Sequence, residues 1–152
     1  MRAVVRVAFG CDHAGFVLRR AILGRLAKMG VHALDFGCKS GQEPVDYPDY
    51  AGRVARAVSR GKADLGLLCC GTGIGMSIAA NKIPGARAAV VWDAASARLA
   101  REHNAANVLC LGGRMLTPKK AMAAVTACLR SKPSSEPRHR RRLAKIRKLE
   151  KK

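Results

Sequence analysis

Short apolar runs alternate with segments of helical periodicity along most of the chain. The run Leu65–Cys69 is apolar throughout, as strands covered on both faces are. Leu18, Ile22 and Leu26 recur at the spacing of one helical stripe, which Gly30 ends. By this pattern we predict strands over residues 4–9, 32–36, 65–69, 87–91 and 108–111, and helices over 14–29, 50–60, about 75–81, 94–103 and 118–130, with a last basic helix from about residue 135.

The strict alternation of strands and helices predicts the fold class. It is typical of an α/β protein whose parallel sheet is doubly wound, with helices on both faces. We expect one domain over residues 1–152, in which 138–152 form a basic C-terminal helix and tail. In such sheets ligands bind beyond the carboxyl ends of the strands, so the residues that directly follow strands are the candidates for function.

The composition is that of a globular protein. Apolar residues make up 49% and charged residues 26% of the chain, and no apolar run approaches the roughly 18 residues that a membrane-spanning helix needs. The N-terminus reads as a first strand and not as a signal peptide, so we expect a cytoplasmic protein without membrane contact. The six cysteines show no C-x-x-C spacing, which argues against a zinc site and favours reduced thiols.

The formal net charge of +19 is extreme and is concentrated at the C-terminus, where residues 130–152 hold eleven basic side chains. Such a segment is compatible with a nucleic-acid partner, with a phosphorylated small molecule, or with a solvated face. A primary nucleic-acid function would not explain the polar residues that cluster at strand ends. With six aromatic residues the chain also lacks the stacking platforms of a single-strand binder.

A glycine-rich segment, Cys-Gly-Thr-Gly-Ile-Gly from Cys70 to Gly75, follows the third predicted strand. Glycines at alternate positions allow successive backbone N–H groups to point into one cavity, which suits a phosphate, a carboxylate or a developing oxyanion. A dinucleotide fingerprint would need glycine at Met76 and belongs after the first strand, and no Gly-Lys-Ser/Thr sequence marks a Walker loop. A purely structural turn remains the alternative.

Cys70 lies directly before this loop, where aligned amides favour the thiolate. A thiolate beside an oxyanion site serves either as a base or as a nucleophile, and a Cys–His hydrolase would pair it with His13 or His103. Asp12 follows the first strand as an N-cap or as a ligand group. In the C-terminal helix Arg138 and Arg142 share one face, either to clamp a phosphate or as part of a solvated surface.

Taken together, several motifs closely resemble the type B ribose-5-phosphate isomerases, a family shared with the galactose-6-phosphate isomerase subunits. The resemblance runs in order from about Val7 to Ile146. It rests on Gly-Cys-Asp-His-Ala-Gly after the first strand, Asp46-Tyr47-Pro48, the glycine-rich segment after Cys70, Ala79-Ala80-Asn81-Lys82, Arg101-Glu102-His103-Asn104, and Arg138-His139 with Arg142.

The resemblance implies a Rossmann-like five-stranded parallel sheet, a homodimer or dimer of dimers with active sites at the subunit interface, and no metal or cofactor. It implies interconversion of D-ribose 5-phosphate and D-ribulose 5-phosphate through a cis-enediolate, in the non-oxidative pentose phosphate pathway. The catalytic residues would be Cys70 as the base, His103 of the other subunit for ring opening with help from Thr72, and Asp12 at the sugar hydroxyls. The substrate-binding residues would be His13, Tyr47, Gly71, Gly73, Ile74, Gly75, Asn104, Arg114, Arg138 and Arg142.

Two features depart from the family pattern. One branch of the family uses a glutamate as base just after the glycine loop, where this chain has Met76, so Cys70 is the only candidate. The basic charge of Arg140, Arg141 and the lysines beyond Ile146 also exceeds what a substrate phosphate requires, which leaves a secondary anionic partner open. Within the enzyme class the alternative substrates are allose 6-phosphate and galactose 6-phosphate, and a basic nucleic-acid-binding protein is the distant alternative.

Overall fold

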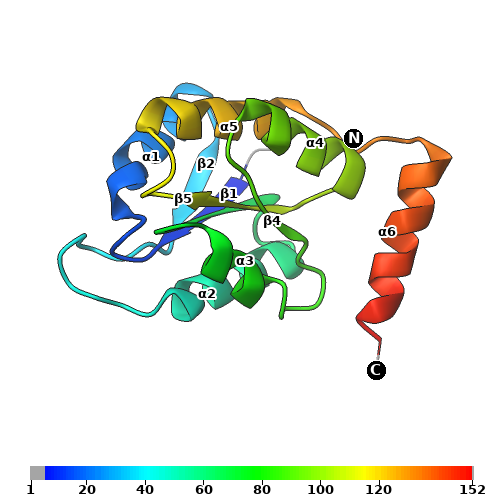
Figure 1. Ribbon diagram of the computed structural model, residues 1–152, viewed down its shortest axis with the longest axis horizontal. Helices are drawn as coiled ribbons and strands as arrows, with labels where there is room; N and C mark the ends of the chain where they lie inside the picture. Colours follow the sequence, from blue (N-terminus) through cyan, green and yellow to red (C-terminus); the bar gives the residue numbers. More distant parts are fainter. Residues whose placement is uncertain (1–5, 152) are drawn as a thin grey trace.

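The computed structural model describes residues 6–151 and contains one five-stranded parallel sheet with the strand order β2-β1-β3-β5-β4. This arrangement confirms the predicted fold class (Figure 1). The strands are β1 Arg6–Cys11, β2 His32–Asp35, β3 Leu65–Cys70, β4 Ala88–Val90 and β5 Val108–Gly112. The helices are the 3₁₀ turn Phe16–Leu18 and α1 Arg19–Lys28, α2 Tyr47–Ser59, α3 Ile74–Ala80, α4 Ala94–Asn104, α5 Pro118–Arg130 and α6 Pro137–Leu149.

The chain reverses its direction of winding between β1 and β3. From β1 it first adds β2 on one side, and β3 then pairs with β1 on the other side, with Cys11 opposite Cys69. Because this is the topological switch point of the sheet, the loops that follow β1 and β3 diverge there and leave room for a ligand. The segments after Cys11 and Cys70 therefore start side by side at the carboxyl edge and border the same space.

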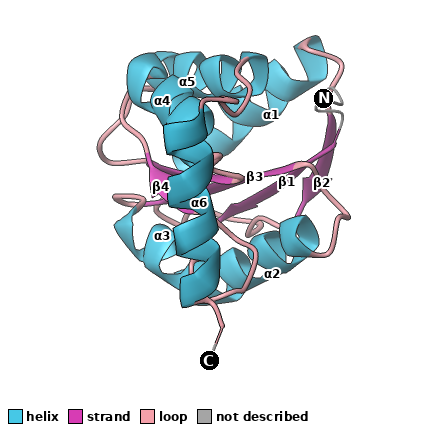
Figure 2. Cartoon of the chain, turned by 90° about the vertical axis from the view of Figure 1, so that its right-hand side faces the viewer, coloured by secondary structure: helices cyan, strands magenta, loops and turns pink. Residues whose placement is uncertain are grey.

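Side chains of successive strand residues enter two separate cores, one on each face of the sheet. Phe9, Leu67 and Cys69 face α1, α4 and α5, whereas Leu68 and Cys70 face α2 and α3. Figure 2 shows the two helical layers on either side of the sheet. Alternation along a strand sends adjacent side chains to opposite faces, so Cys69 and Cys70 have different surroundings although they are neighbours.

Several predicted boundaries need correction. β1 ends at Cys11 and not at residue 9, β2 ends at Asp35, β4 covers only Ala88–Val90, and β5 extends to Gly112. The first helix does not start at residue 14, because the segment 14–18 is tightened by the bond from Leu18 N–H to the Gly15 carbonyl and α1 begins at Arg19. The third strand includes Cys70, because its ladder continues to the pair Cys70–Gly112. α2 begins at Tyr47 and not at residue 50, because proline in the first turn is compatible with a helix start. The predicted first strand began at residues 4 and 5, which lie outside the described residues.

The capping predictions for two helices are confirmed. Asp93 accepts a hydrogen bond from the Ser96 backbone and closes a capping box at α4, and Thr117 accepts from the Lys120 backbone at α5. α6 begins at Pro137 as predicted. This helix crosses the flank of the sheet, away from the carboxyl ends of β1 and β5 (Figures 1 and 2).

The structure contains buried thiols whose pKa values are raised, so we expect the free energy of unfolding to fall in alkaline solution. Burial raises the pKa of Cys128 to about 11 and that of Cys11 to about 12, and it also raises the pKa of Cys69 and Cys110. An unfolded thiol has a pKa of ~8.5. A pKa that is higher in the folded state contributes stability that is complete below the unfolded pKa and is lost as the pH rises towards the folded value.

The free energy of unfolding should therefore fall above about pH 8.5, by about 1.4 kcal/mol per pH unit for each thiol that ionises only in the unfolded chain. Urea unfolding at pH 8, 9 and 10 measures this slope. The variant Cys128→Ala should show a slope that is smaller by one thiol. A free energy that stays constant over this range would contradict the prediction.

Candidate active site

Cys70 ends β3 at the switch point, and its thiol is held by the loop that follows. The Cys70 side chain is only 4% exposed, and its Sγ accepts a hydrogen bond of 3.1 Å from the Gly73 N–H. The loop bends back to the sulfur because Gly73 has a φ of 82°, in the region that favours glycine. The loop therefore aims a backbone donor at the sulfur.

The predicted phosphate ligand Arg114 lies against the same loop. Because β5 pairs with β3, Arg114, the second residue after β5, can donate from its backbone to the Gly71 carbonyl, at 2.9 Å. The Arg114 guanidinium covers Gly71 so closely that a Cβ there would lie 2.7 Å from its Nη1. The glycine therefore allows a cation to approach the backbone beside Cys70.

Asp12 and His13 reach the loop from the end of β1. The Asp12 backbone N–H donates to the Cys69 carbonyl at 3.1 Å, and its buried carboxylate accepts from the Gly15 N–H at 2.9 Å. Asp12 thus caps a tight turn, in agreement with the interpretation of this residue as a cap; its alternative role as a ligand group stays a prediction. His13 Nδ1 accepts from the Val45 N–H at 3.1 Å, which assigns the ring proton to Nε2 and leaves that nitrogen as a donor.

Tyr47 reaches the glycine loop from the first turn of α2. Its ring packs on Gly75, where a Cβ would lie 2.6 Å from Cζ. The Tyr47 side chain remains 40% exposed, so the phenol borders the loop from the solvent side. The Thr72 hydroxyl accepts from the Ile74 N–H at 3.2 Å and shapes the same loop. The structure thus gathers one group of predicted site residues, namely Asp12, His13, Tyr47, Cys70, Gly71, Thr72, Gly73, Ile74, Gly75 and Arg114.

A second group of predicted site residues lies elsewhere in the chain. α4 returns from the carboxyl edge to the amino edge of the sheet, so His103 and Asn104 at its end lie away from Cys70. The helix ends there because Ala105 adopts a left-handed conformation with a φ of 45°. Arg138 and Arg142 belong to α6 on the same flank (Figure 1). A single chain therefore does not bring these four residues to the glycine loop.

His139 is a residue of this second group that the sequence reasoning left without a role. It is 5% exposed, and its ring stacks on that of His103 with centroids 4.3 Å apart. Burial, followed by the proximity of His103, lowers the pKa of His139. The two residues lie 36 positions apart on different helices, so no local pattern could have indicated the stack.

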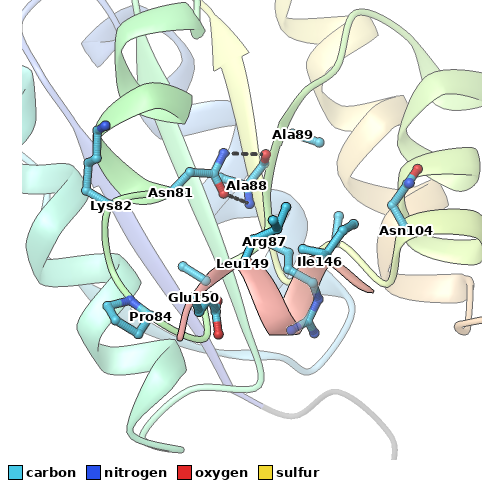
Figure 3. A pocket seen from close by; sticks show the side chains of 12 residues that line it. Asn81, Lys82, Pro84, Arg87, Ala88, Ala89, Asn104, Ile146, Leu149 and Glu150 are labelled. Atoms are coloured by element: carbon cyan, nitrogen blue, oxygen red, sulfur yellow. Dashed lines mark hydrogen bonds between the residues drawn. The ribbon is translucent and has the colours of Figure 1, made fainter. Parts of the chain in front are cut away.

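A hollow of about 750 Å³ lies where α6 approaches the amino ends of β4 and β5 (Figure 3). The Asn81 side chain at its wall both donates to and accepts from the Ala88 backbone, at 2.9 and 2.8 Å. Asn104 and Ile146 also line it. This hollow belongs to the second group and not to the surroundings of Cys70.

Among residues 6–151, no group of three or more His, Cys, Asp or Glu side chains is arranged to hold a metal ion. Within the same described part of the chain, no helix is both long and apolar enough to cross a membrane.

Comparison with known proteins relates this geometry to a family. Residues 7–146 match the family described as Ribose/Galactose Isomerase. The chain belongs to this family. Its relative from Escherichia coli K12, ribose-5-phosphate isomerase B, is 45% identical over 145 residues, which are 95% of this chain and 96% of that protein.

Solved structures of Ribose/Galactose Isomerase family members share the fold closely. The type B ribose 5-phosphate isomerase of Trypanosoma brucei is 47% identical with a TM-score of 0.92, over 96% of this chain and 99% of that chain. The ribose-5-phosphate isomerase B of Mycoplasma genitalium, solved with bound ribulose-5-phosphate, is 37% identical with a TM-score of 0.92 over 99% of both chains. The family resemblance read from the motifs is thereby confirmed.

Proposed function

We infer that this chain is a ribose-5-phosphate isomerase that interconverts D-ribose 5-phosphate and D-ribulose 5-phosphate. The observation that carries this inference is the Cys70 thiol at the switch point, with the Gly73 N–H on its sulfur and the Arg114 guanidinium against the next residue. A base, an oxyanion site and a cation at one strand end are what isomerisation of a sugar phosphate requires. The relatives named above are ribose-5-phosphate isomerases of type B, and the chain covers nearly their whole length.

In the proposed reaction, Cys70 as thiolate removes the proton from C2 of the open-chain aldose. The C–H electrons form a double bond between C1 and C2 while the carbonyl electrons move onto O1, which gives a cis-enediolate. A proton then passes from O2 to O1, and the thiol returns its own proton to C1, which leaves the carbonyl at C2. Backbone amides of the glycine loop stabilise the negative charge on oxygen as it develops. Because the reaction moves a proton within one molecule without net oxidation, and the loop amides stabilise the oxyanion, the proposed chemistry uses neither a redox cofactor nor a metal.

We also propose a homodimer in which His103 and Asn104 of one subunit complete the site around Cys70 of the other. Two observations support it. The two groups of site residues lie far apart in the folded structure of one chain. In addition, large apolar side chains are exposed on α3, which follows the glycine loop, and directly after β4. Ile74 and Ile78 lie one turn apart on α3 and are 56% and 59% exposed, and Trp92, just after β4, is 64% exposed. A second copy would bury these side chains while supplying His103.

The phosphate of the substrate would bind between His13 and Arg114 of one subunit and Arg138 and Arg142 of the other. Arg138 pairs with Glu136 at 2.8 Å, but both side chains are more than half exposed, so this pair contributes little stability and can be exchanged. The six free thiols fit a reducing compartment, so we place the reaction in the cytoplasm and in the non-oxidative pentose phosphate pathway.

Replacing either arginine should weaken substrate binding more than turnover. Each guanidinium gives charge-assisted hydrogen bonds to a phosphate that does not react, so Arg138→Ala or Arg142→Ala should raise KM by about ten- to a hundredfold with less change in kcat. The control is Arg140→Ala, which removes the same charge from another face of α6, where Arg140 lines a different hollow with Pro133 and Ser134. An unchanged KM in both test variants would show that Arg138 and Arg142 belong to a solvated basic surface and do not bind the phosphate.

A coupled assay with ribose 5-phosphate and allose 6-phosphate side by side tests the proposed function. We expect kcat/KM to favour the five-carbon substrate. Preference for a six-carbon sugar phosphate would keep the reaction class and change the substrate, whereas activity on neither would overturn the proposal.

A further inference from the structure

Two cysteines that the proposed chemistry does not use lie together beside the site. The Sγ atoms of Cys11 and Cys38 are 3.9 Å apart, and the side chains are 0% and 6% exposed. Cys11 ends β1 and Cys38 follows β2, so the pairing of β1 with β2 brings together two thiols that lie 27 positions apart. Both thiols are free.

The backbone around this pair already suits a covalent link. The Cys38 N–H donates to the Cys11 carbonyl at 3.0 Å, which ties the segment after β2 to the end of β1. A Cβ on Gly37, the residue before Cys38, would lie 3.0 Å from the Cys11 Sγ, so the Cys11 thiol points at this segment. The sulfurs need to approach by roughly 2 Å to reach the bond length of about 2.05 Å.

We propose that Cys11 and Cys38 form a peroxide-reactive dithiol, which hydrogen peroxide or an organic hydroperoxide converts into a reversible disulfide next to the substrate site. The Cys38 thiolate attacks one peroxide oxygen, which breaks the O–O bond, forms a sulfenic acid and releases hydroxide. The Cys11 sulfur then displaces the sulfenic oxygen, which leaves as water with the Cys11 proton. The hydroxide takes up the proton that the Cys38 thiol lost. In sum, two thiols and one hydrogen peroxide give one disulfide and two waters, and an organic hydroperoxide gives one alcohol and one water instead.

The order of the two thiols follows from their surroundings. Cys38 is the more exposed of the two and lies in an irregular loop, where its thiol donates a hydrogen bond of 3.2 Å to the Ser40 carbonyl; this bond must open before the sulfur attacks. Burial raises the pKa of Cys11 to about 12, so Cys11 is a poor first nucleophile. It is suited to the second step, in which a sulfenic acid has come within bonding distance.

The disulfide would act on the substrate site through the loop after β2. β1 is flanked by β2 and β3 and cannot move easily, so the loop that carries Cys38 must shift towards Cys11. The same loop provides the Val45 N–H that holds His13 Nδ1 and leads into Tyr47. Loss of one such hydrogen bond corresponds to about a three- to tenfold rise in KM, with less change in kcat.

The covalent step is tested without reference to activity. The Cys70→Ser chain, which lacks the candidate catalytic thiol, is treated with one to two equivalents of hydrogen peroxide, alkylated and digested with trypsin without reduction. Trypsin releases Cys11 in peptide 7–19 and Cys38 in peptide 29–39. We expect these two peptides to be linked, with a loss of about 2 Da that dithiothreitol restores. Unlinked peptides in which Cys38 carries a sulfinic acid, or a link between peptides 63–82 and 102–114, would overturn the proposal.

The coupling to the site rests on the proposed isomerase function and has its own readout. The native sequence, Cys38→Ser and the control Cys128→Ser are each treated with peroxide and assayed with ribose 5-phosphate before and after dithiothreitol. A rise in KM that is reversed by dithiothreitol should occur in the native sequence and in Cys128→Ser but not in Cys38→Ser. The same response in all three would contradict the proposed coupling between the disulfide and the substrate site. The absence of activity in every untreated sample would contradict the proposed isomerase function and leave the proposed disulfide unaffected.

Discussion

Replacing Cys70 with alanine should lower kcat by about 10²- to 10⁴-fold, because general-base catalysis typically contributes this much and the thiol is the proposed base. Met76 occupies the position that is glutamate in one branch of the family, and its fully buried thioether cannot accept a proton at neutral pH. The thiol acts on the reacting carbons and not on the phosphate. Calorimetric titration with ribose 5-phosphate should therefore give an affinity close to that of the native sequence.

The matched control for this variant is its neighbour, Cys69→Ala. Cys69 belongs to the core that faces α1, α4 and α5, on the other side of the sheet from Cys70. Its truncation should cost some stability and leave kcat near the native value. If Cys70→Ala kept more than about a tenth of native turnover, another residue would carry the proton.

Mixing two inactive variants should restore activity if the site is shared between subunits. His103→Asn should impair ring opening and hence the conversion of ribose 5-phosphate, while Cys70→Ala lacks the base. In a mixed dimer one site combines Cys70 of the first chain with His103 of the second, and the other site lacks both. After subunit exchange at equal amounts, half of the dimers are mixed and half of their sites are intact, so about a quarter of native activity should return.

The control for this experiment mixes two variants whose substituted residues both lie around the glycine loop of one chain. Cys70→Ala mixed with Arg114→Ala should restore no intact site, because both residues lie around the same glycine loop of one chain. Activity that remained absent in the Cys70→Ala and His103→Asn mixture, despite demonstrated exchange, would show that each chain builds its own complete site.

Local chemistry made much of the fold predictable. Three features depend on residues within a few positions of each other, so the sequence is sufficient to indicate them. They are the alternation of strands and helices, the cap at Asp93, and the helix start at Thr117–Pro118. The same holds for the glycine loop after Cys70, where the left-handed Gly73 directs an amide to the sulfur. Errors occurred where local signals were weak, as at the start of α2 and in the tight turn before α1.

Spatial relations between distant residues required the tertiary structure. Strand order decides that Cys11 meets Cys38, that Arg114 covers Gly71, and that the end of α4 lies away from Cys70. Sequence periodicity indicates which residues face a core but not which strand lies beside which, because the order depends on the packing of the whole sheet. The sequence by itself therefore determined the elements and the chemistry of each loop. The family resemblance had already assigned His103 to the other subunit. Only the tertiary structure showed that Asn104, Arg138 and Arg142 also lie away from Cys70, since backbone pairing and helix direction act over the full length of the chain.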